Sequence, residues 1–95
     1  MRLRWTPDAA DDLEGIYEYL LGVWPALAKP TVVRIYRELG YLKKFPHMGR
    51  VSLKPSIREL ILWPLPYICA YRVEETAVVL LRIHHTSQDQ PSSGS

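Results

Sequence analysis

The sequence predicts an α+β domain with the order β-α-α-β-β-β, in which an N-terminal strand and a helical hairpin pack on a mainly antiparallel C-terminal sheet. Three apolar, β-prone runs follow one another between residues 57 and 85, separated by Pro64-Leu65-Pro66 and Glu74-Glu75-Thr76. Two longer segments before them carry apolar residues at three- and four-residue steps. Short connections make neighbouring strands antiparallel, and a sheet can cover the apolar side of a helical hairpin.

The chain is short enough for a single domain. Its 95 residues, of which 47% are hydrophobic, allow one ordinary globular core. We expect the domain to span residues 1–89, with residues 90–95 forming a disordered polar tail. The single cysteine, Cys69, excludes an internal disulfide and fits a cytoplasmic location. We expect neither a membrane span nor a signal peptide, because no apolar run is long enough.

Charge is unevenly distributed, although the net charge is only +2. Residues 1–28 sum to −3, residues 29–58 to +7 and residues 59–95 to −2. A concentrated basic segment indicates an anionic partner, either nucleic acid or an acidic peptide. A solvated helix face explains the same charges equally well.

The N-terminus predicts a strand followed by a helix. Residues 1–5 alternate, with Leu3 and Trp5 on the face opposite the two arginines, which is typical of a short strand. Thr6-Pro7-Asp8 is typical of a helix start, with Thr6 as N-cap and Pro7 at the first helical position. We predict the helix over residues 7–21 and its end at Gly22. Its apolar stripe is Ala9, Leu13, Ile16, Tyr17 and Leu20.

A second helix is predicted over residues 27–44, after a loop at residues 23–25. Pro30 is expected in its first turn, where the missing N–H costs little. Two helices joined by a short loop form an antiparallel hairpin. The predicted apolar stripe is Val32, Ile35, Tyr36, Leu39 and Leu42. Four basic residues lie largely off this stripe: Arg34, Arg37, Lys43 and Lys44.

The last predicted strand delivers basic and titratable groups to the end of a sheet, which suits chemistry or recognition. Residues 45–50 are predicted as a turn and residues 52–56 as a loop that leads into the three strands. Alternation along the last strand puts Val78, Leu80, Arg82 and His84 on one face, and residues 79, 81, 83 and 85 on the other. We expect the side with Arg82 and His84 to face away from the helices.

An ordered set of short features extends over residues 3–89. They are Ala9-Ala10-Asp11-Asp12-Leu13 with Ile16 and Tyr19, Trp24, Leu42 and Phe45-Pro46 before Gly49-Arg50, Arg58-Glu59-Leu60, Pro66-Tyr67 with Tyr71-Arg72-Val73, and Val79-Leu80-Leu81-Arg82-Ile83 followed by His85. In this combination the chain resembles the RelE/ParE superfamily of toxins from bacterial type II toxin–antitoxin systems. No single motif is specific, but their order is.

The resemblance implies two mechanisms on one fold. RelE-like members are metal-free ribonucleases that cut mRNA in the ribosomal A site, whereas ParE-like members poison DNA gyrase. Both kinds are neutralised by a cognate antitoxin from the same operon, and operator DNA is contacted only through that antitoxin. The resemblance implies no cofactor, and the helix dipole already explains the acids of the first helix, so we expect no metal.

The nuclease interpretation depends on four candidate catalytic residues: Arg58, Arg82, His84 and His85. RNA cleavage without metal needs a base, an acid and cations around the phosphate. Arg82-Ile83-His84-His85 resembles the Arg-Tyr-His-Tyr ending of YoeB-type nucleases, with His84 on the catalytic histidine. However, Ile68 stands where such nucleases carry arginine in a Tyr-Arg-x-x-Tyr pattern, and Lys54 is alone where RelE has a lysine pair.

The ParE interpretation fits the body of the chain better, because the hairpin, Trp24 and the Gly49-Arg50 end resemble that branch. The candidate target- or antitoxin-binding residues are Trp24, Arg34, Arg37, Lys43, Lys44, Arg50 and Arg72. Structural roles stay open for several residues. His85 can bond the backbone at the strand end, Arg72 and Arg82 can be paired or solvated, and Arg50 can pair with Glu14 or Glu18.

The sequence thus predicts a ParE-like toxin that acts on gyrase by binding rather than by covalent chemistry. The first alternative is a ribosome-dependent mRNA endonuclease that uses His84 or His85 with Arg58 and Arg82. The second is a decayed toxin that retains only antitoxin binding.

Overall fold

The computed structural model describes residues 1–88. Its elements, in chain order, are β1 (Arg2–Trp5), α1 (Pro7–Val23), α2 (Pro25–Gly40), a 3₁₀ turn (Tyr41–Lys43), β2 (Arg50–Val51), β3 (Arg58–Ile61), β4 (Tyr67–Val73), β5 (Ala77–His85) and a second 3₁₀ turn (Thr86–Gln88). The predicted fold class is confirmed, with β2 as a further strand. The predicted tail at residues 90–95 lies outside the described residues.

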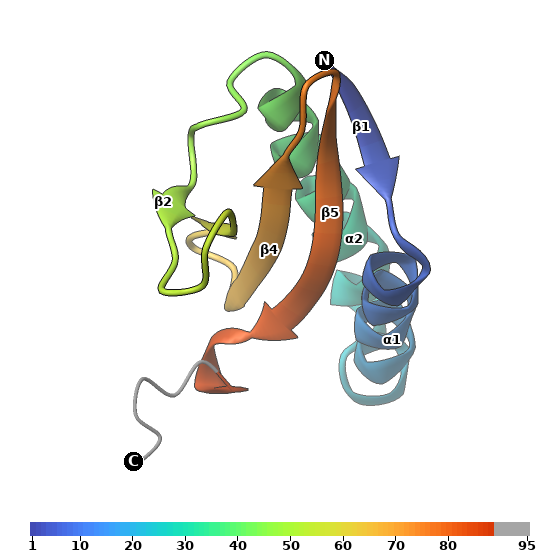
Figure 1. Cartoon of the computed structure of the whole chain (residues 1–95). Helices are drawn as coiled ribbons and strands as arrows, with labels where there is room; N and C mark the ends of the chain where they lie inside the picture. The colour runs from blue at the N-terminus through green and yellow to red at the C-terminus, as the bar shows by residue number, and fades with distance from the viewer. Residues whose placement is uncertain (89–95) are drawn as a thin grey trace.

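One sheet holds the strands in the order β1-β5-β4-β3-β2. β1 is parallel to β5, and the remaining neighbours are antiparallel. α1 and α2 lie against the same face of this sheet (Figure 1). The opposite face, which neither α1 nor α2 covers, is called the outer face below.

The start of α1 is capped as the sequence predicts. The Thr6 hydroxyl accepts a hydrogen bond from the Ala9 N–H at 3.1 Å, and Pro7 occupies the first helical position. The same hydroxyl donates to the Leu80 carbonyl at 2.7 Å. Thr6 therefore joins the first turn of α1 to β5 as well as capping the helix.

The boundaries of the hairpin differ from the prediction. α1 continues through Gly22, and only Trp24 separates it from α2. α2 begins at Pro25 because a proline is well suited to the first helical position. Pro30 therefore lies inside the helix, not in its first turn, and cannot donate the usual hydrogen bond to the preceding turn. α2 ends at Gly40, and the chain tightens into the 3₁₀ turn before Lys44.

The sheet departs from simple alternation at two places. No strand was predicted at β2, where Arg50 belongs to the predicted turn and Val51 follows it, but both residues pair with β3. In β5, Leu81 is an extra residue, because Leu80 pairs with Tyr71 and Arg82 pairs with Ala70. Leu80 and Ile83 therefore both enter the core. The predicted outward position of Arg82 and His84 is right, but placing Val78 and Leu80 on their face is wrong.

The core lies between the helices and the inner face of the sheet. Its largest fully buried side chains include Tyr71, Ile35, Leu39, Leu42 and Leu80. Tyr17 and Tyr36 were predicted as core residues but are 37% and 57% exposed. Each lies one position, or about 100° around the helix, beyond a better-placed isoleucine. Tyr36 instead stacks on Trp5, with ring centroids 5.3 Å apart.

Candidate functional site

The outer face is built from residues that alternate with core residues along the strands. The register places Arg82, Ala70, Glu59 and Arg50 in one row across β5, β4, β3 and β2. Four residues adjacent to this row along β3, β4 and β5 belong to the hydrophobic core: Leu60, Cys69, Tyr71 and Ile83. Because successive side chains of a strand point to opposite faces, this row projects away from the helices.

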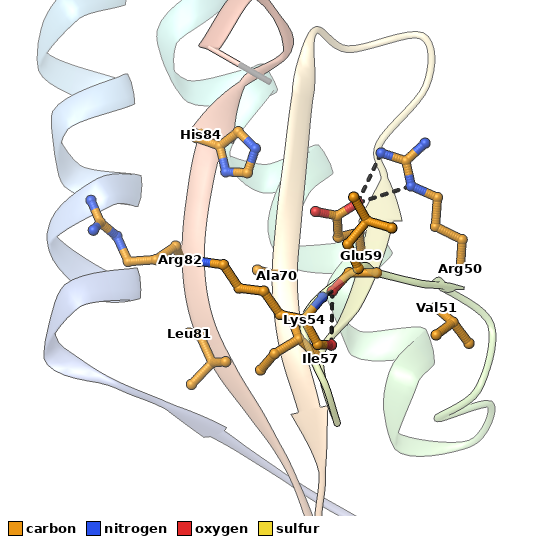
Figure 2. A pocket seen from close by; sticks show the side chains of 11 residues that line it. Arg50, Val51, Lys54, Ile57, Glu59, Ala70, Leu81, Arg82 and His84 are labelled. Atoms are coloured by element: carbon orange, nitrogen blue, oxygen red, sulfur yellow. Dashed lines mark hydrogen bonds and ion pairs between the residues drawn. The ribbon is translucent and has the colours of Figure 1, made fainter. Parts of the chain in front are cut away.

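A cavity of about 690 Å³ opens on the outer face. This volume lies within the range of about 300–1,000 Å³ that is usual for ligand pockets. Lys54 and Ile57, from the segment between β2 and β3, lie in front of β4, and the Lys54 side chain extends toward β5 (Figure 2). The lining residues of the cavity are Arg50, Val51, Ser52, Leu53, Lys54, Ile57, Glu59, Ala70, Leu81, Arg82 and His84.

The cations around this cavity have different partners. Arg50 forms an ion pair with Glu59 at 2.8 Å, so the expected pairing with Glu14 or Glu18 is wrong. Arg82 turns toward α1 (Figure 2), where its Nε and Nη2 donate to Asp12 at 2.8 and 3.1 Å. Among residues 1–88, no carboxylate forms an ion pair with Lys54.

Asp12 is a fixed acceptor at the edge of β5. One of its oxygens also accepts the Ile83 backbone N–H at 2.8 Å. Burial raises the pKa of the Asp12 carboxyl, but the hydrogen bonds from Arg82 and Ile83 outweigh burial and leave the pKa below 3.8. β1 pairs with β5 only as far as Leu80, so it does not reach the Ile83 N–H on the same edge of β5. Asp12 accepts the hydrogen bond from this N–H instead.

The two candidate catalytic histidines share one cavity. His84 pairs with Ile68 and His85 with Tyr67, and both line a cavity of about 710 Å³ beside Asp12 of α1; His84 also lines the outer cavity. The His85 ring meets the Tyr67 ring edge-on at 5.5 Å between centroids. Its Nδ1 accepts the Ser87 backbone N–H at 3.1 Å and lies 2.8 Å from the Ser87 hydroxyl. The predicted role of His85 in bonding the backbone at the strand end is confirmed.

Arg58 supports a turn. Its Nη1 donates to the Gly49 carbonyl at 2.7 Å and to the His47 carbonyl at 3.4 Å. The Tyr71 hydroxyl holds the same turn, because it accepts the Gly49 N–H at 2.8 Å and donates to the Pro46 carbonyl at 2.8 Å. Arg58 is therefore engaged with the backbone that leads into β2, away from His85.

Comparisons with known proteins agree with this architecture. Residues 3–90 match the family described as "ParE toxin of type II toxin-antitoxin system, parDE". The chain belongs to this family. It is 36% identical over 90 residues to "Putative toxin Y4kP" of Sinorhizobium fredii, which covers 95% of this chain and 93% of that protein. It is 31% identical over 84 residues to "Toxin RelE2" of Caulobacter vibrioides, which covers 88% of this chain and 93% of that protein.

A solved structure is also similar to this ParE-family toxin. It is described as "Chromosomal ParDE TA system from P. aeruginosa" and is 32% identical, with a TM-score of 0.84 over 90% of this chain and 95% of that chain. These matches establish the chain as a type II toxin of the RelE/ParE superfamily. The two curated relatives carry different names, so they leave its target to be argued from the site.

The remaining predicted binding residues of the toxin lie in two separate parts of the fold, the helical hairpin with the segment after it and the sheet. Trp24, 61% exposed, lies at the junction of α1 and α2. The basic residues Arg34, Arg37, Lys43 and Lys44 lie on α2 and in the segment after it. Arg72 belongs to β4 and forms an ion pair with Glu74 at 2.9 Å, one of the two roles left open for it. The +7 segment is thus not one surface, because only its Arg50 and Lys54 reach the outer cavity.

Sequence reasoning gave too little weight to three residues of the toxin's cavity. The sequence singles out Lys54 only as one base of the +7 segment and as a lone lysine where RelE has a pair; it places Leu53 in a loop and assigns no element to Val51. Val51 and Leu53 are 71% and 103% exposed. A signal was present in apolar residues alternating with polar ones around position 52, but a two-residue strand is too short to identify by periodicity.

Two further observations limit the chemistry of the toxin. Over residues 1–88, no group of three or more His, Cys, Asp or Glu side chains is arranged to hold a metal ion. Within the same residues, no helix combines the length and apolarity needed to cross a membrane.

Proposed function

We propose that this ParE-family toxin acts by binding DNA gyrase and is neutralised by an antitoxin from a neighbouring gene. The supporting observation is that both candidate phosphate-binding arginines already have partners within the fold. Arg58 holds the carbonyls of a turn and Arg82 holds Asp12, although His84 and His85 line one cavity beside Asp12. A metal-free ribonuclease needs its base, acid and cations around one phosphate, so binding is the better explanation of toxicity.

A gyrase supercoiling assay tests this proposal. Purified toxin is added to gyrase, relaxed plasmid and ATP, and the topoisomers are separated on agarose. We expect inhibition that saturates with toxin concentration and is reversed by stoichiometric antitoxin. Normal supercoiling at saturating toxin would overturn the gyrase assignment.

The ribonuclease alternative keeps one supporting observation. Lys54, Arg82 and His84 line the same cavity, so a cation and a titratable group are close enough to be considered together. Primer extension on messages from a cell-free translation reaction tests it. New cuts at ribosome-occupied codons that disappear with His84→Ala would make the toxin an mRNA endonuclease. Unchanged toxicity of His84→Ala and His85→Ala variants, which we expect, excludes it.

A further inference from the structure

The cavity that His84 and His85 share lies between α1 and the end of β5, and it is called the α1–β5 cavity below. Its lining residues fall within 11–20, 66–67 and 83–87. We propose that this cavity binds an arginine-bearing segment of DNA gyrase. The inference rests on the proposed function, because it presupposes gyrase as the target. The shape of α1, the charge of the lining and its aromatic rings each support it.

One face of α1 forms a wall of the α1–β5 cavity, and α1 runs beside β5 (Figure 1). Residues four positions apart lie one above the other on a helix, so two such series form a continuous surface. The two series are Asp11, Gly15 and Tyr19, and Asp12, Ile16 and Leu20. The first series is exposed and the second is partly buried. The wall therefore offers an acid and an aromatic ring to a partner, with apolar side chains beneath them.

The charge of the lining suits a cation. No Lys or Arg among residues 1–88 lines the cavity. Asp12 is already held by Arg82, but in the part of the chain that the structure describes no basic side chain forms an ion pair with Asp11. His85 adds no positive charge in this arrangement, because its Nδ1 accepts the Ser87 N–H and so carries no proton. The cavity therefore attracts a cationic side chain and repels a phosphate.

Gly15 leaves the middle of the α1 wall open. A Cβ atom added at Gly15 would meet no other atom within 4 Å. Glycine is also less favourable than most residues inside a helix, so α1 does not need it for its own stability. Asp11 and Tyr19 lie on either side of Gly15, two turns or about 12 Å apart along the helix axis. A long side chain can therefore lie across Gly15 between the carboxylate and the ring.

The two ends of this path favour arginine. Tyr19 is 66% exposed, so most of its ring is available to a partner, and Tyr67 lines the same cavity. The apolar stem of an arginine can pack against the Tyr19 ring, and its planar guanidinium can donate two N–H groups to the Asp11 carboxylate. A protein that holds DNA neutralises phosphates with Lys and Arg. The DNA-binding surface of gyrase therefore carries side chains of the charge that complements this cavity.

Gyrase binding by matched variants tests the inference. Whole gyrase from the same bacterium is passed over immobilised toxin, and the Kd is measured by surface plasmon resonance at low and high salt. Gly15→Leu fills the cavity, and Asp11→Lys reverses a charge in its lining. The controls, Gly22→Leu and Glu14→Lys, make the same changes at exposed positions of α1 that do not line the cavity. A Cβ at Gly22 also meets no atom within 4 Å. Circular dichroism checks that all four variants remain folded.

We expect each cavity variant to weaken gyrase binding by at least about tenfold, and each control to stay within about threefold of wild type. High salt should weaken binding of the wild type more than binding of Asp11→Lys. No binding of gyrase by the wild type would refute the proposed function itself. Wild-type affinity in both cavity variants would overturn only the assignment of the cavity. Ribosome-dependent mRNA cleavage that is lost in Gly15→Leu, with gyrase affinity unchanged, would assign the cavity to RNA instead.

Discussion

Replacing Tyr71 by Phe tests whether one hydroxyl group fixes the turn that leads into β2. The Tyr71 side chain is 0% exposed, and its hydroxyl bridges the Gly49 N–H and the Pro46 carbonyl, each at 2.8 Å. Phe preserves the ring but lacks the hydroxyl. The Gly49 N–H and the Pro46 carbonyl therefore each lose their hydrogen-bond partner. An unsatisfied buried polar group costs about 1–3 kcal/mol. Since the Gly49 bond is buried and the Pro46 bond only partly buried, we expect a total loss of about 2–4 kcal/mol.

The assay is urea unfolding at 25 °C, followed by far-ultraviolet circular dichroism. Each kcal/mol lowers the Tm of a domain this size by about 4–8 °C, so the Tm of the variant should be lower by about 8–32 °C. Tyr41→Phe is the control, because the Tyr41 side chain is 48% exposed. A Tyr71→Phe loss no larger than that of the control would refute the reasoning, since it would mean that the turn does not depend on the hydroxyl.

Three further predictions concern residues that join α1 to the sheet or lie beneath it. Thr6→Ala removes both the helix cap and the hydrogen bond to Leu80, so urea unfolding should show a loss of about 1–2 kcal/mol; an unchanged midpoint would contradict this. The folded-state pKa of Asp12 is lower than 3.8, so its carboxylate stabilises the fold above that pH and the contribution is lost as the pH falls through the folded pKa. The stability difference between wild type and Asp12→Asn should therefore shrink below pH 3.8, and a constant difference would count against it. Burial raises the pKa of Cys69 to about 12, so a thiol reagent should label the protein no faster than it unfolds, whereas faster labelling at pH 8 would show an accessible thiolate.

The sequence was sufficient for features that depend on local patterns. The Thr6 cap, the two amphipathic helices and the main strands follow from spacing over a few residues. Whether Arg72 is paired was left open by the sequence, and its partner proves to be Glu74, only two positions away. These elements in order were enough to indicate the fold and the toxin superfamily.

The site needed contacts that no local pattern contains. The extra residue at Leu81 changes which side chains enter the core, yet its own sequence run is uniformly apolar. Arg58 is a candidate catalytic residue from the sequence because a cation can hold the phosphate, and only the folded turn shows that it binds backbone carbonyls. Lys54 and Leu53 gain importance only because the folded chain places both in the lining of the outer cavity.

The pairing of the first strand with the last bears on how the toxin is made. β1 pairs with β5 along its whole length, and the Thr6 contact to Leu80 joins residues 74 positions apart. Ribosomes synthesise the chain from the N-terminus, so β1 emerges long before its partner exists. The sheet cannot close until β5 has left the exit tunnel, and contacts of such long sequence separation slow folding. Until then, the nascent toxin holds β1 as a strand without its partner, and its edge is open to wrong pairing.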